Sequence, residues 1–234
     1  MQRFITAERT WPEPSRWHVY VLPDLDTDAD LRRLVEQSHA VLAGHPALSV
    51  VPEPWLHATM QMVTGRAGDD VTEAQRAALT GALHEHVGGL APFTATAGAV
   101  LAGTSGVVLD LDQDLPGEPF AVLGDRVRAA IGAVFGADGL RYDPGVPHIS
   151  LAYATGDGDS GEVQDHLRKT IRPSRARLSV AAVWLLDVIQ DAARSQYRWH
   201  EPLARIPLRG TSHPIDARTE PRPRSSVSHE RDEE

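Results

Sequence analysis

Two short segments of the sequence decide the fold prediction, WLHATM at residues 55–60 and PHISL at residues 147–151. Each contains a histidine, then any residue, then a hydroxyl residue followed by an apolar residue: His57 with Thr59, and His148 with Ser150. Both lie in apolar stretches typical of strands, where residues two apart point to the same face. Each strand should therefore present an imidazole and a hydroxyl side by side.

These side chains suit chemistry at phosphorus. An imidazole with an unperturbed pKa near 6.5 can accept or donate a proton near neutrality, so two of them can serve as base and acid. Hydroxyl groups can donate hydrogen bonds to the non-bridging phosphoryl oxygens. If the two polar faces oppose each other, the four groups define a phosphate-sized site that needs no metal ion.

The chain around the two motifs alternates helices with strands. Apolar residues at three- and four-residue spacing, together with capping residues, predict four helices, at about 28–43, 73–87, 120–135 and 160–171. Strand-like segments fill the spaces between them. We predict strands at 17–22, 55–63, 93–101, 107–111, 148–154, 178–189 and 197–207.

The order of these elements suggests an internal duplication. After residue 55 the predicted order is strand, helix, two strands, helix; after residue 148 it is again strand, helix, two strands. We therefore predict an α+β fold, bilobal and pseudo-symmetric, with duplicated α+β units and antiparallel sheets around a central cleft. The domain should span residues 17–210, after an N-terminal extension at 1–16 and before a disordered tail at 211–234.

The two motifs resemble those of the two-histidine phosphoesterases, which include the 2′-5′ RNA ligase-like proteins and 2′,3′-cyclic phosphodiesterases. The resemblance covers roughly residues 17–208. It implies a bilobal fold with the motifs on facing strands, metal-independent cleavage of phosphodiesters, and catalytic roles for His57, Thr59, His148 and Ser150. Met60 and Ser150 depart from the commoner leucine and threonine, but neither departure removes a functional atom.

Further site residues follow from strand parity. Trp55 and Gln61 have the parity of His57 and Thr59, so we expect Trp55 to stack on a base and Gln61 to bind a phosphate or ribose oxygen. A rim or core position for Trp55 and a solvated Gln61 are the alternatives. We assign His148 as base and His57 as acid, although the pseudo-symmetry makes the reverse almost equally good.

Composition limits the other possibilities. The net charge is −9, which disfavours duplex DNA as a partner. The chain has no cysteine, which excludes disulfides and thiolate chemistry and fits the cytoplasm. The first residues do not resemble an export signal, and the longest apolar stretch is too short to span a bilayer. We expect a cytoplasmic monomer with no cofactor, no metal and no membrane contact.

The leading functional prediction is a phosphodiesterase for 2′,3′-cyclic phosphate ends of nucleotides or RNA. With a ribose hydroxyl as the nucleophile, the same residues could catalyse the reverse reaction, 2′-5′ ligation. Two alternatives stay open: a nucleotide- or RNA-end-binding module of the same fold with little turnover, and a phosphodiesterase for a cyclic phosphate that is not RNA.

Overall fold

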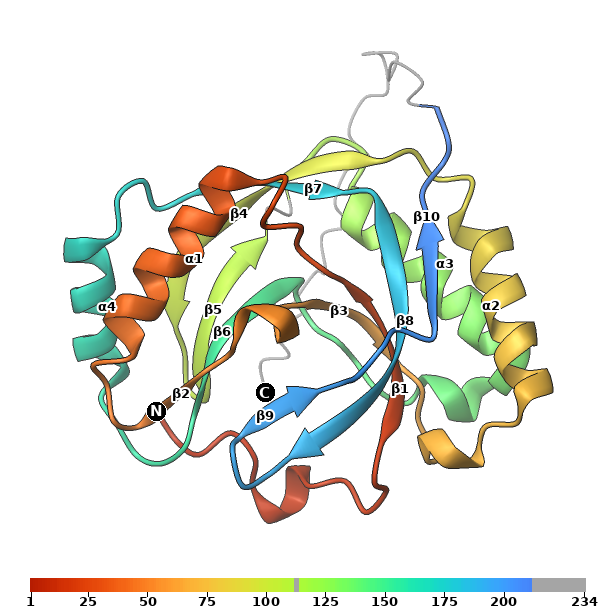
Figure 1. The fold of residues 1–234 in the computed structure, drawn as a ribbon, viewed down its shortest axis with the longest axis horizontal. Coiled ribbons are helices and arrows are strands. Elements are labelled where there is room, and N and C mark those ends of the chain that lie inside the picture. The colour runs from red at the N-terminus through yellow and green to blue at the C-terminus, as the bar shows by residue number, and fades with distance from the viewer. Residues whose placement is uncertain (112–113, 212–234) are drawn as a thin grey trace, which may run out of the picture.

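The computed structural model describes residues 1–111 and 114–211 (Figure 1). The helices are α1 (Ala29–Leu42), α2 (Glu73–Val87), α3 (Pro119–Phe135) and α4 (Ser160–Thr170). The strands are β1 (Arg16–Val21), β2 (Leu48–Val50), β3 (Ala58–Met62), β4 (Phe93–Ala102), β5 (Gly106–Leu111), β6 (His148–Ala154), β7 (Ala176–Val180), β8 (Ala182–Asp191), β9 (Gln196–Arg198) and β10 (Ala204–Pro207). The predicted tail lies, from residue 212 onward, outside the described residues.

The strands form a curled antiparallel sheet in the order β10-β8-β1-β3-β6-β5-β4-β7, with β2 beside β6 and β9 beside β8. The middle of this order is the junction of β3 and β6, where Ala58 lies opposite Ile149. The strands from β10 to β3 lie on one side of the junction, and those from β6 to β7 lie on the other. The sheet therefore consists of two halves, here the β3 half and the β6 half, and each half carries one histidine motif at the junction.

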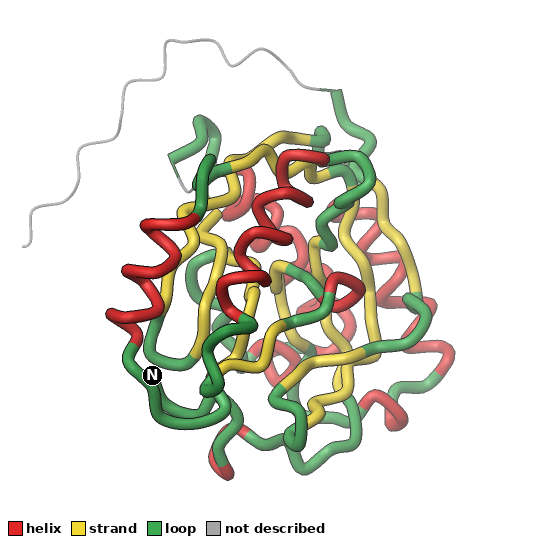
Figure 2. The backbone as a smooth tube through the Cα atoms, turned by 60° about the vertical axis from the view of Figure 1, so that its left-hand side comes forward, coloured by secondary structure: helices red, strands yellow, loops and turns green. Residues whose placement is uncertain are grey.

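Each half of the sheet is covered by its own helix pair. Helices α2 and α3 pack together against β10 and β3, whereas α1 and α4 pack against β6, β7 and β4, so the two pairs lie on opposite sides in Figure 1. The turned view in Figure 2 also shows helices flanking the strands. The main core lies between the sheet and these helices, and it includes Val19, Leu83, Leu109 and Ile131, none of them accessible to solvent. The α+β, bilobal and pseudo-symmetric fold is confirmed.

The four predicted helices are confirmed. Helix α2 begins with a complete capping box, in which the Thr72 hydroxyl accepts from the Gln75 backbone N–H and the Gln75 side chain accepts from the Thr72 N–H. Helix α3 ends at Phe135 and is followed by Gly136, whose positive φ of 67° suits glycine. Helix α4 is capped by Asp159, whose carboxylate accepts from the first backbone N–H groups.

Three strand predictions were wrong in their limits. The segment 55–63 begins with a 3-10 turn at Glu53–Trp55, which follows Pro52, so β3 starts only at Ala58. The segment 178–189 is two strands in different halves of the sheet, since β7 pairs with β4 and β8 pairs with β1. The segment 197–207 is also two strands, β9 and β10, separated by a turn that contains Pro202.

The duplication is present, but its predicted starting point was wrong. The positions of the strands in the sheet relate β1-α1-β3-α2-β4 to β5-α3-β6-α4-β8, so each repeat begins one strand and one helix before its histidine motif. The last strand of each repeat lies in the other half of the sheet: β4 pairs with β5, and β8 pairs with β1. The sequence order hides this exchange because strand pairing is not local.

Residues before β1 pack against the domain. The backbone N–H of Phe4 donates to the Ala154 carbonyl at 2.8 Å, and that of Gln2 donates to the Thr104 carbonyl at 2.7 Å. Ile5 is buried. A 3-10 turn at Ala7–Arg9 follows, and Trp11 then packs beside β8 and β9. We call residues 1–15 the N-terminal strap.

Across the described residues, the helices are all too short or too polar to cross a membrane.

Candidate active site

The two motifs meet at the junction of the halves. The antiparallel pair Ala58–Ile149 sets the register, and its extension by one residue in each direction places His57 opposite Ser150 and Thr59 opposite His148. His57 and His148 are then diagonal neighbours on one face, which typically lie about 7 to 8 Å apart. The structure thus brings all four predicted catalytic residues together around a local two-fold axis.

Both imidazoles are held in the same way. The Nδ1 atom of His57 is 2.7 Å from the Trp55 carbonyl oxygen, and that of His148 is 2.8 Å from the Val146 carbonyl oxygen. Because a carbonyl only accepts, Nδ1 carries the proton in the neutral ring and Nε2 is left as the acceptor. In each motif the residue two positions earlier therefore fixes the tautomer and leaves Nε2 available for proton transfer.

The two histidines differ in burial. Only 5% of His57 is exposed, and burial lowers its pKa from 6.5 to about 4, with the bond to the Trp55 carbonyl opposing this and the charge of His148 adding to it. His148 is partly exposed, at the start of β6. At neutral pH the His57 ring is therefore uncharged in the free protein.

A bulge follows the hydroxyl residue in both motifs. In β3, Thr59 lies opposite Tyr20 and Gln61 lies opposite Val19, which leaves Met60 as the extra residue. In β6, Ser150 lies opposite Val108 and Ala152 opposite Val107, which leaves Leu151 as the extra residue. A bulge reverses the face of every residue after it.

The first bulge overturns the parity argument for Gln61. Gln61 faces the helices with Val19 and is fully buried. Its Oε1 accepts from Arg128 on α3 at 3.0 Å, while its Nε2 donates to the Tyr142 carbonyl at 2.9 Å and to the Met62 carbonyl at 3.3 Å. Both ends of the amide thus have partners, and Gln61 ties the loop before His148 to β3 and α3.

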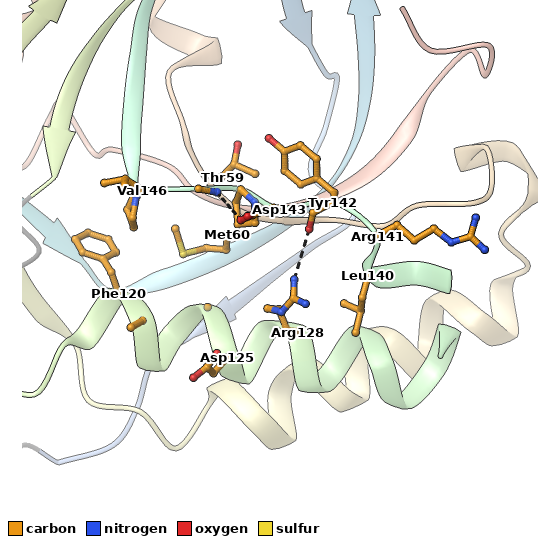
Figure 3. Close-up of a pocket in the computed structure, with 15 residues that line it drawn as sticks. Thr59, Met60, Phe120, Asp125, Arg128, Leu140, Arg141, Tyr142, Asp143 and Val146 are labelled. Carbon is orange, nitrogen blue, oxygen red and sulfur yellow. Dashed lines mark hydrogen bonds between the residues drawn. The ribbon is translucent and has the colours of Figure 1, made fainter. Parts of the chain in front are cut away.

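This loop borders a groove of about 710 Å³ (Figure 3). The groove lies between α3 and residues 140–147 and reaches the motifs at Thr59 and Met60. In Figure 3, Arg128 points from α3 to the Tyr142 carbonyl, and the Tyr142 ring points to the side of Thr59. Val146, 61% exposed, is one of its apolar lining residues. Its lining includes Thr59 but neither histidine, so the groove adjoins the two imidazoles rather than containing them.

Aromatic rings surround His57 on the face away from the helices. The Tyr20 ring stacks on the His57 ring with centroids 4.1 Å apart and an interplanar angle of 15°, and Trp199 meets the same imidazole edge-on at 5.5 Å. Tyr197 lies 6.5 Å from His57 and 5.7 Å from Tyr153. We call this set the aromatic cluster: Phe4, Trp11, His18, Tyr20, Tyr153, Tyr197 and Trp199.

The phenols of the cluster reach the motif hydroxyls. Tyr20 lies opposite Thr59 in the pairing of β1 with β3, and Tyr153 interacts with Ser150. Burial raises the pKa of both phenols well above the usual value of 10. The second bulge puts Ala152 opposite Val107, on the core face. The next residue, Tyr153, lies opposite Gly106 and therefore points to the same face as Ser150. Protonated phenols therefore extend the row of O–H groups beside the two imidazoles.

His18 is a third histidine of the cluster, which sequence reasoning missed. It is buried, its Nδ1 contacts the Tyr20 hydroxyl, and its Nε2 is buried without a partner among the described residues. Burial, with the charges of His57 and Arg16, lowers its pKa well below 6.5. His18 is thus a neutral group that orients the Tyr20 phenol.

Trp55 lies in the 3-10 turn before His57 rather than in the strand. Its Nε1 donates to the Trp199 carbonyl at 3.4 Å, and the Arg198 guanidinium lies 5.7 Å from its ring centroid. Its carbonyl holds His57. The stacking of a base on Trp55 stays a prediction, whereas the carbonyl contact gives Trp55 a direct role in orienting the imidazole.

Within the part of the chain that the structure describes, no three His, Asp or Glu side chains are arranged to hold a metal ion. The site as described consists of two imidazoles, two aliphatic hydroxyls and the adjacent phenols.

One signal could have found part of the aromatic cluster. His18 and Tyr20 have the same two-residue spacing, on the predicted strand 17–22, as the residues of the motifs. The other members come from β6, β9, the turn that follows and the N-terminal strap. No local pattern links these segments, because only the sheet order and the second bulge bring them to one face.

No protein-family model matches the sequence, and no curated protein matches it. Solved structures do match the fold. A crystal structure of TT0787 of Thermus thermophilus is 18% identical, with a TM-score of 0.60, over 84% of this chain and 100% of that chain. A phosphoesterase crystal structure is 18% identical, with a TM-score of 0.56, over 83% of this chain and 99% of that chain.

Escherichia coli LigT has the same fold. Its apo form is 20% identical, with a TM-score of 0.54, over 84% of this chain and 98% of that chain. Its complex with ATP matches at the same identity with a TM-score of 0.53. The resemblance inferred from the two motifs is therefore confirmed at the level of the fold: this chain has the fold of the LigT-like phosphoesterases.

Proposed function

We propose that this protein is a metal-independent phosphodiesterase that opens 2′,3′-cyclic phosphate ends of nucleotides or RNA. One observation carries the proposal: two His-x-Thr/Ser motifs lie side by side in antiparallel register, with each Nδ1 held by the carbonyl two residues earlier. This arrangement offers two free Nε2 atoms and two hydroxyls to one phosphate group. Acid and base on opposite sides of phosphorus are what in-line displacement requires.

In the reaction, one neutral imidazole takes a proton from water as the water oxygen attacks phosphorus. The bond from phosphorus to the 2′ or 3′ oxygen breaks, and the second imidazole gives its proton to that oxygen. The products are a phosphomonoester and a free hydroxyl, and the two imidazoles have exchanged protonation states. Proton exchange with water restores them.

Burial favours His57 as the base and His148 as the acid, the reverse of the assignment made from sequence. A base must be unprotonated, and the lowered pKa of His57 keeps it so at neutral pH. His148, which is partly exposed at the start of β6, is then the acid that protonates the leaving oxygen. Thr59 and Ser150 donate hydrogen bonds to the non-bridging phosphoryl oxygens, and Trp55 stacks on the nucleobase of the substrate.

The fold comparisons support this proposal at the coarse level of phosphoesterase chemistry, and the E. coli LigT complex with ATP supports nucleotide binding. The cyclic end, the choice between hydrolysis and 2′-5′ ligation, and a monomeric state in the cytoplasm belong to the proposal. For Gln61 we propose a positioning role through the loop at 140–147, in place of direct substrate contact.

The test is hydrolysis of the four 2′,3′-cyclic mononucleotides and of a short RNA with a cyclic end, in EDTA, by wild type, His57→Gln and His148→Gln. The matched control is His84→Gln, a change of an exposed histidine on α2. Circular dichroism checks the folding of each variant. We expect EDTA-resistant turnover that falls at least about 100-fold in both motif variants and stays unchanged in the control.

The other outcomes select the alternatives. Tight binding of a cyclic nucleotide without product over long incubation would replace the enzyme with a binding module. Turnover of a cyclic phosphate such as that of ADP-ribose, but of none of the RNA-type substrates, would keep the mechanism and change the substrate. Loss of wild-type turnover in EDTA would overturn the metal-independent mechanism.

A further inference from the structure

The N-terminal strap forms one wall of the aromatic cluster. The Phe4 ring stacks on Tyr153 with centroids 4.4 Å apart and an interplanar angle of 19°, and Trp11 stacks on Tyr197 at 5.3 Å and 22°. Trp11 also lies 5.3 Å from His18. Residues before the first strand thus contact the rings that surround His57.

A glutamine of β8 fixes the strap beside Tyr197. The Oε1 atom of Gln190 accepts from the Trp11 backbone N–H at 2.9 Å. Its Nε2 donates to the Arg9 carbonyl at 3.0 Å and to the Tyr197 hydroxyl at 3.3 Å. One amide therefore holds both the backbone of Arg9 and the phenol of Tyr197.

Arg9 has an exposed guanidinium beside Phe4. Its guanidinium lies 5.4 Å from the Phe4 ring centroid and makes one long hydrogen bond, 3.4 Å, to the Phe4 carbonyl. Its backbone carbonyl accepts from Gln190, whose amide also donates to the Tyr197 hydroxyl, and the Phe4 ring beside its guanidinium stacks on Tyr153. In the part of the chain that the structure describes, no carboxylate pairs with this guanidinium.

Two arginines beside the aromatic cluster are paired with carboxylates. Arg16 binds Glu13 at 2.6 Å and Arg198 binds Asp191 at 2.8 Å, whereas Arg128, which lies on α3 at the far side of β3, is held by the neutral Gln61 amide at 3.0 Å. The catalytic groups themselves are neutral hydroxyls, phenols and imidazoles. A substrate that carries only the cyclic phosphate brings one negative charge. A second phosphate adds charge that a cation can stabilise, and Arg9 is placed beside the aromatic cluster to do so.

We propose that the N-terminal strap is part of the substrate site and that Arg9 binds a second phosphate group of the substrate, one that does not react. This inference rests on the proposed function and names its substrate class: a cyclic phosphate that carries a further phosphate, such as a 5′-phosphorylated nucleotide, an RNA end or a cyclic phosphate of a dinucleotide. A cyclic mononucleoside phosphate without that group is the poorer substrate.

The experiment compares adenosine 2′,3′-cyclic phosphate with its 5′-phosphorylated form in wild type, Arg9→Glu and Arg3→Glu. Arg3 is the matched control because it is exposed in the same strap and the charge change is identical. We expect Arg9→Glu to raise KM at least about tenfold for the 5′-phosphorylated substrate alone, with kcat unchanged. The effect should shrink at high salt, since the contact is exposed.

Two results would overturn the inference: equal effects of the two charge reversals, or an equal effect of Arg9→Glu on both substrates. Calorimetric binding separates this inference from the proposed function. If wild type turns over neither substrate, the proposed function fails, and adenosine 3′,5′-bisphosphate and adenosine 3′-monophosphate serve as probes. Tighter binding of the bisphosphate that Arg9→Glu abolishes supports the subsite, and equal binding of the two probes overturns it.

Discussion

The β3 half and the β6 half present the same motif in different surroundings. In both, a carbonyl two residues earlier holds Nδ1, a hydroxyl follows on the same face, and a bulge comes next. His57 nevertheless lies under Tyr20 and Trp199, whereas His148 lies at the exposed end of the loop at 140–147. Duplication thus supplies two histidines in equivalent positions, and burial makes their surroundings different.

The largest expected effect tests whether burial divides the roles. His57→Gln and His148→Gln should each reduce kcat/KM at least about 100-fold. In wild type the acidic limb of the kcat/KM profile belongs to His57, with a midpoint near its lowered pKa of about 4. The residual activity of His148→Gln should keep this acidic limb, whereas that of His57→Gln should lose it. If instead the acidic limb disappears in His148→Gln, His148 is the base and the roles are reversed.

The second prediction concerns stability. The pKa of His57 is about 4 in the folded protein and 6.5 without perturbation, so the unfolded chain binds more protons between these values. Stability should therefore fall as the pH falls from about 6.5 to about 4, and His57 alone should account for about 2 to 3 kcal/mol of the loss.

Urea unfolding at pH 7 and pH 4.5 measures this contribution. His57→Gln should lose correspondingly less stability between the two pH values than wild type does. His84→Gln, the exposed control on α2, should behave as wild type. The buried His18 also has a lowered pKa, so part of the loss should remain in His57→Gln. A slope that His57→Gln leaves unchanged would contradict the buried, neutral state of His57.

The third prediction compares the two hydroxyls. Thr59→Val and Ser150→Ala each remove one donor to the phosphoryl oxygens and should lower kcat on the order of tenfold to 100-fold. Because each hydroxyl has its own phenol, Tyr20 or Tyr153, the two losses should be similar. Single-turnover rates measure the chemical step. A loss confined to one of the two would show that only one half contacts the phosphoryl group.

The smallest effect concerns the loop that holds His148. Gln61→Leu leaves the Arg128 guanidinium and the Tyr142 carbonyl without this partner, which should cost about 1 to 3 kcal/mol of stability and lower turnover a few-fold. Gln164→Leu is the control in the β6 half, where the side chain bonds the backbone of Val100 and Ala102. Gln164→Leu should destabilise the protein without changing turnover. If Gln61→Leu and Gln164→Leu reduce turnover equally, Gln61 has no specific positioning role.

Sequence reasoning succeeded where signals are local. Capping residues and helical spacing gave the four helices, and the repeated His-x-Thr/Ser pattern gave the four residues that the junction brings together. Sequence reasoning failed where one extra residue in a strand reverses the face of the residues that follow it. Strand parity could not detect the bulges at Met60 and Leu151, which are defined only by the partner strand, so Gln61 was placed on the wrong face and Tyr153 was missed.

The exchange of strands and the N-terminal strap were equally inaccessible. The break at Ala181 separates two strands that pair in different halves, and no local feature of the segment 178–189 indicates this. The sequence predicts residues 1–16 as an N-terminal extension, and it does not indicate that Phe4 and Trp11 stack on tyrosines of β6 and β9. Partners distant in sequence decide both features.

The exchanged strands also determine how the protein could be divided. A cut in the turn between β4 and β5, at residues 103–105, would separate the two sequence repeats cleanly. Neither fragment would contain a complete half of the sheet, because the first holds β4 without β5 and the second holds β8 without β1. Each fragment would need the strands of the other to complete its half of the sheet. The site could therefore form only when the two fragments associate, with one histidine supplied by each.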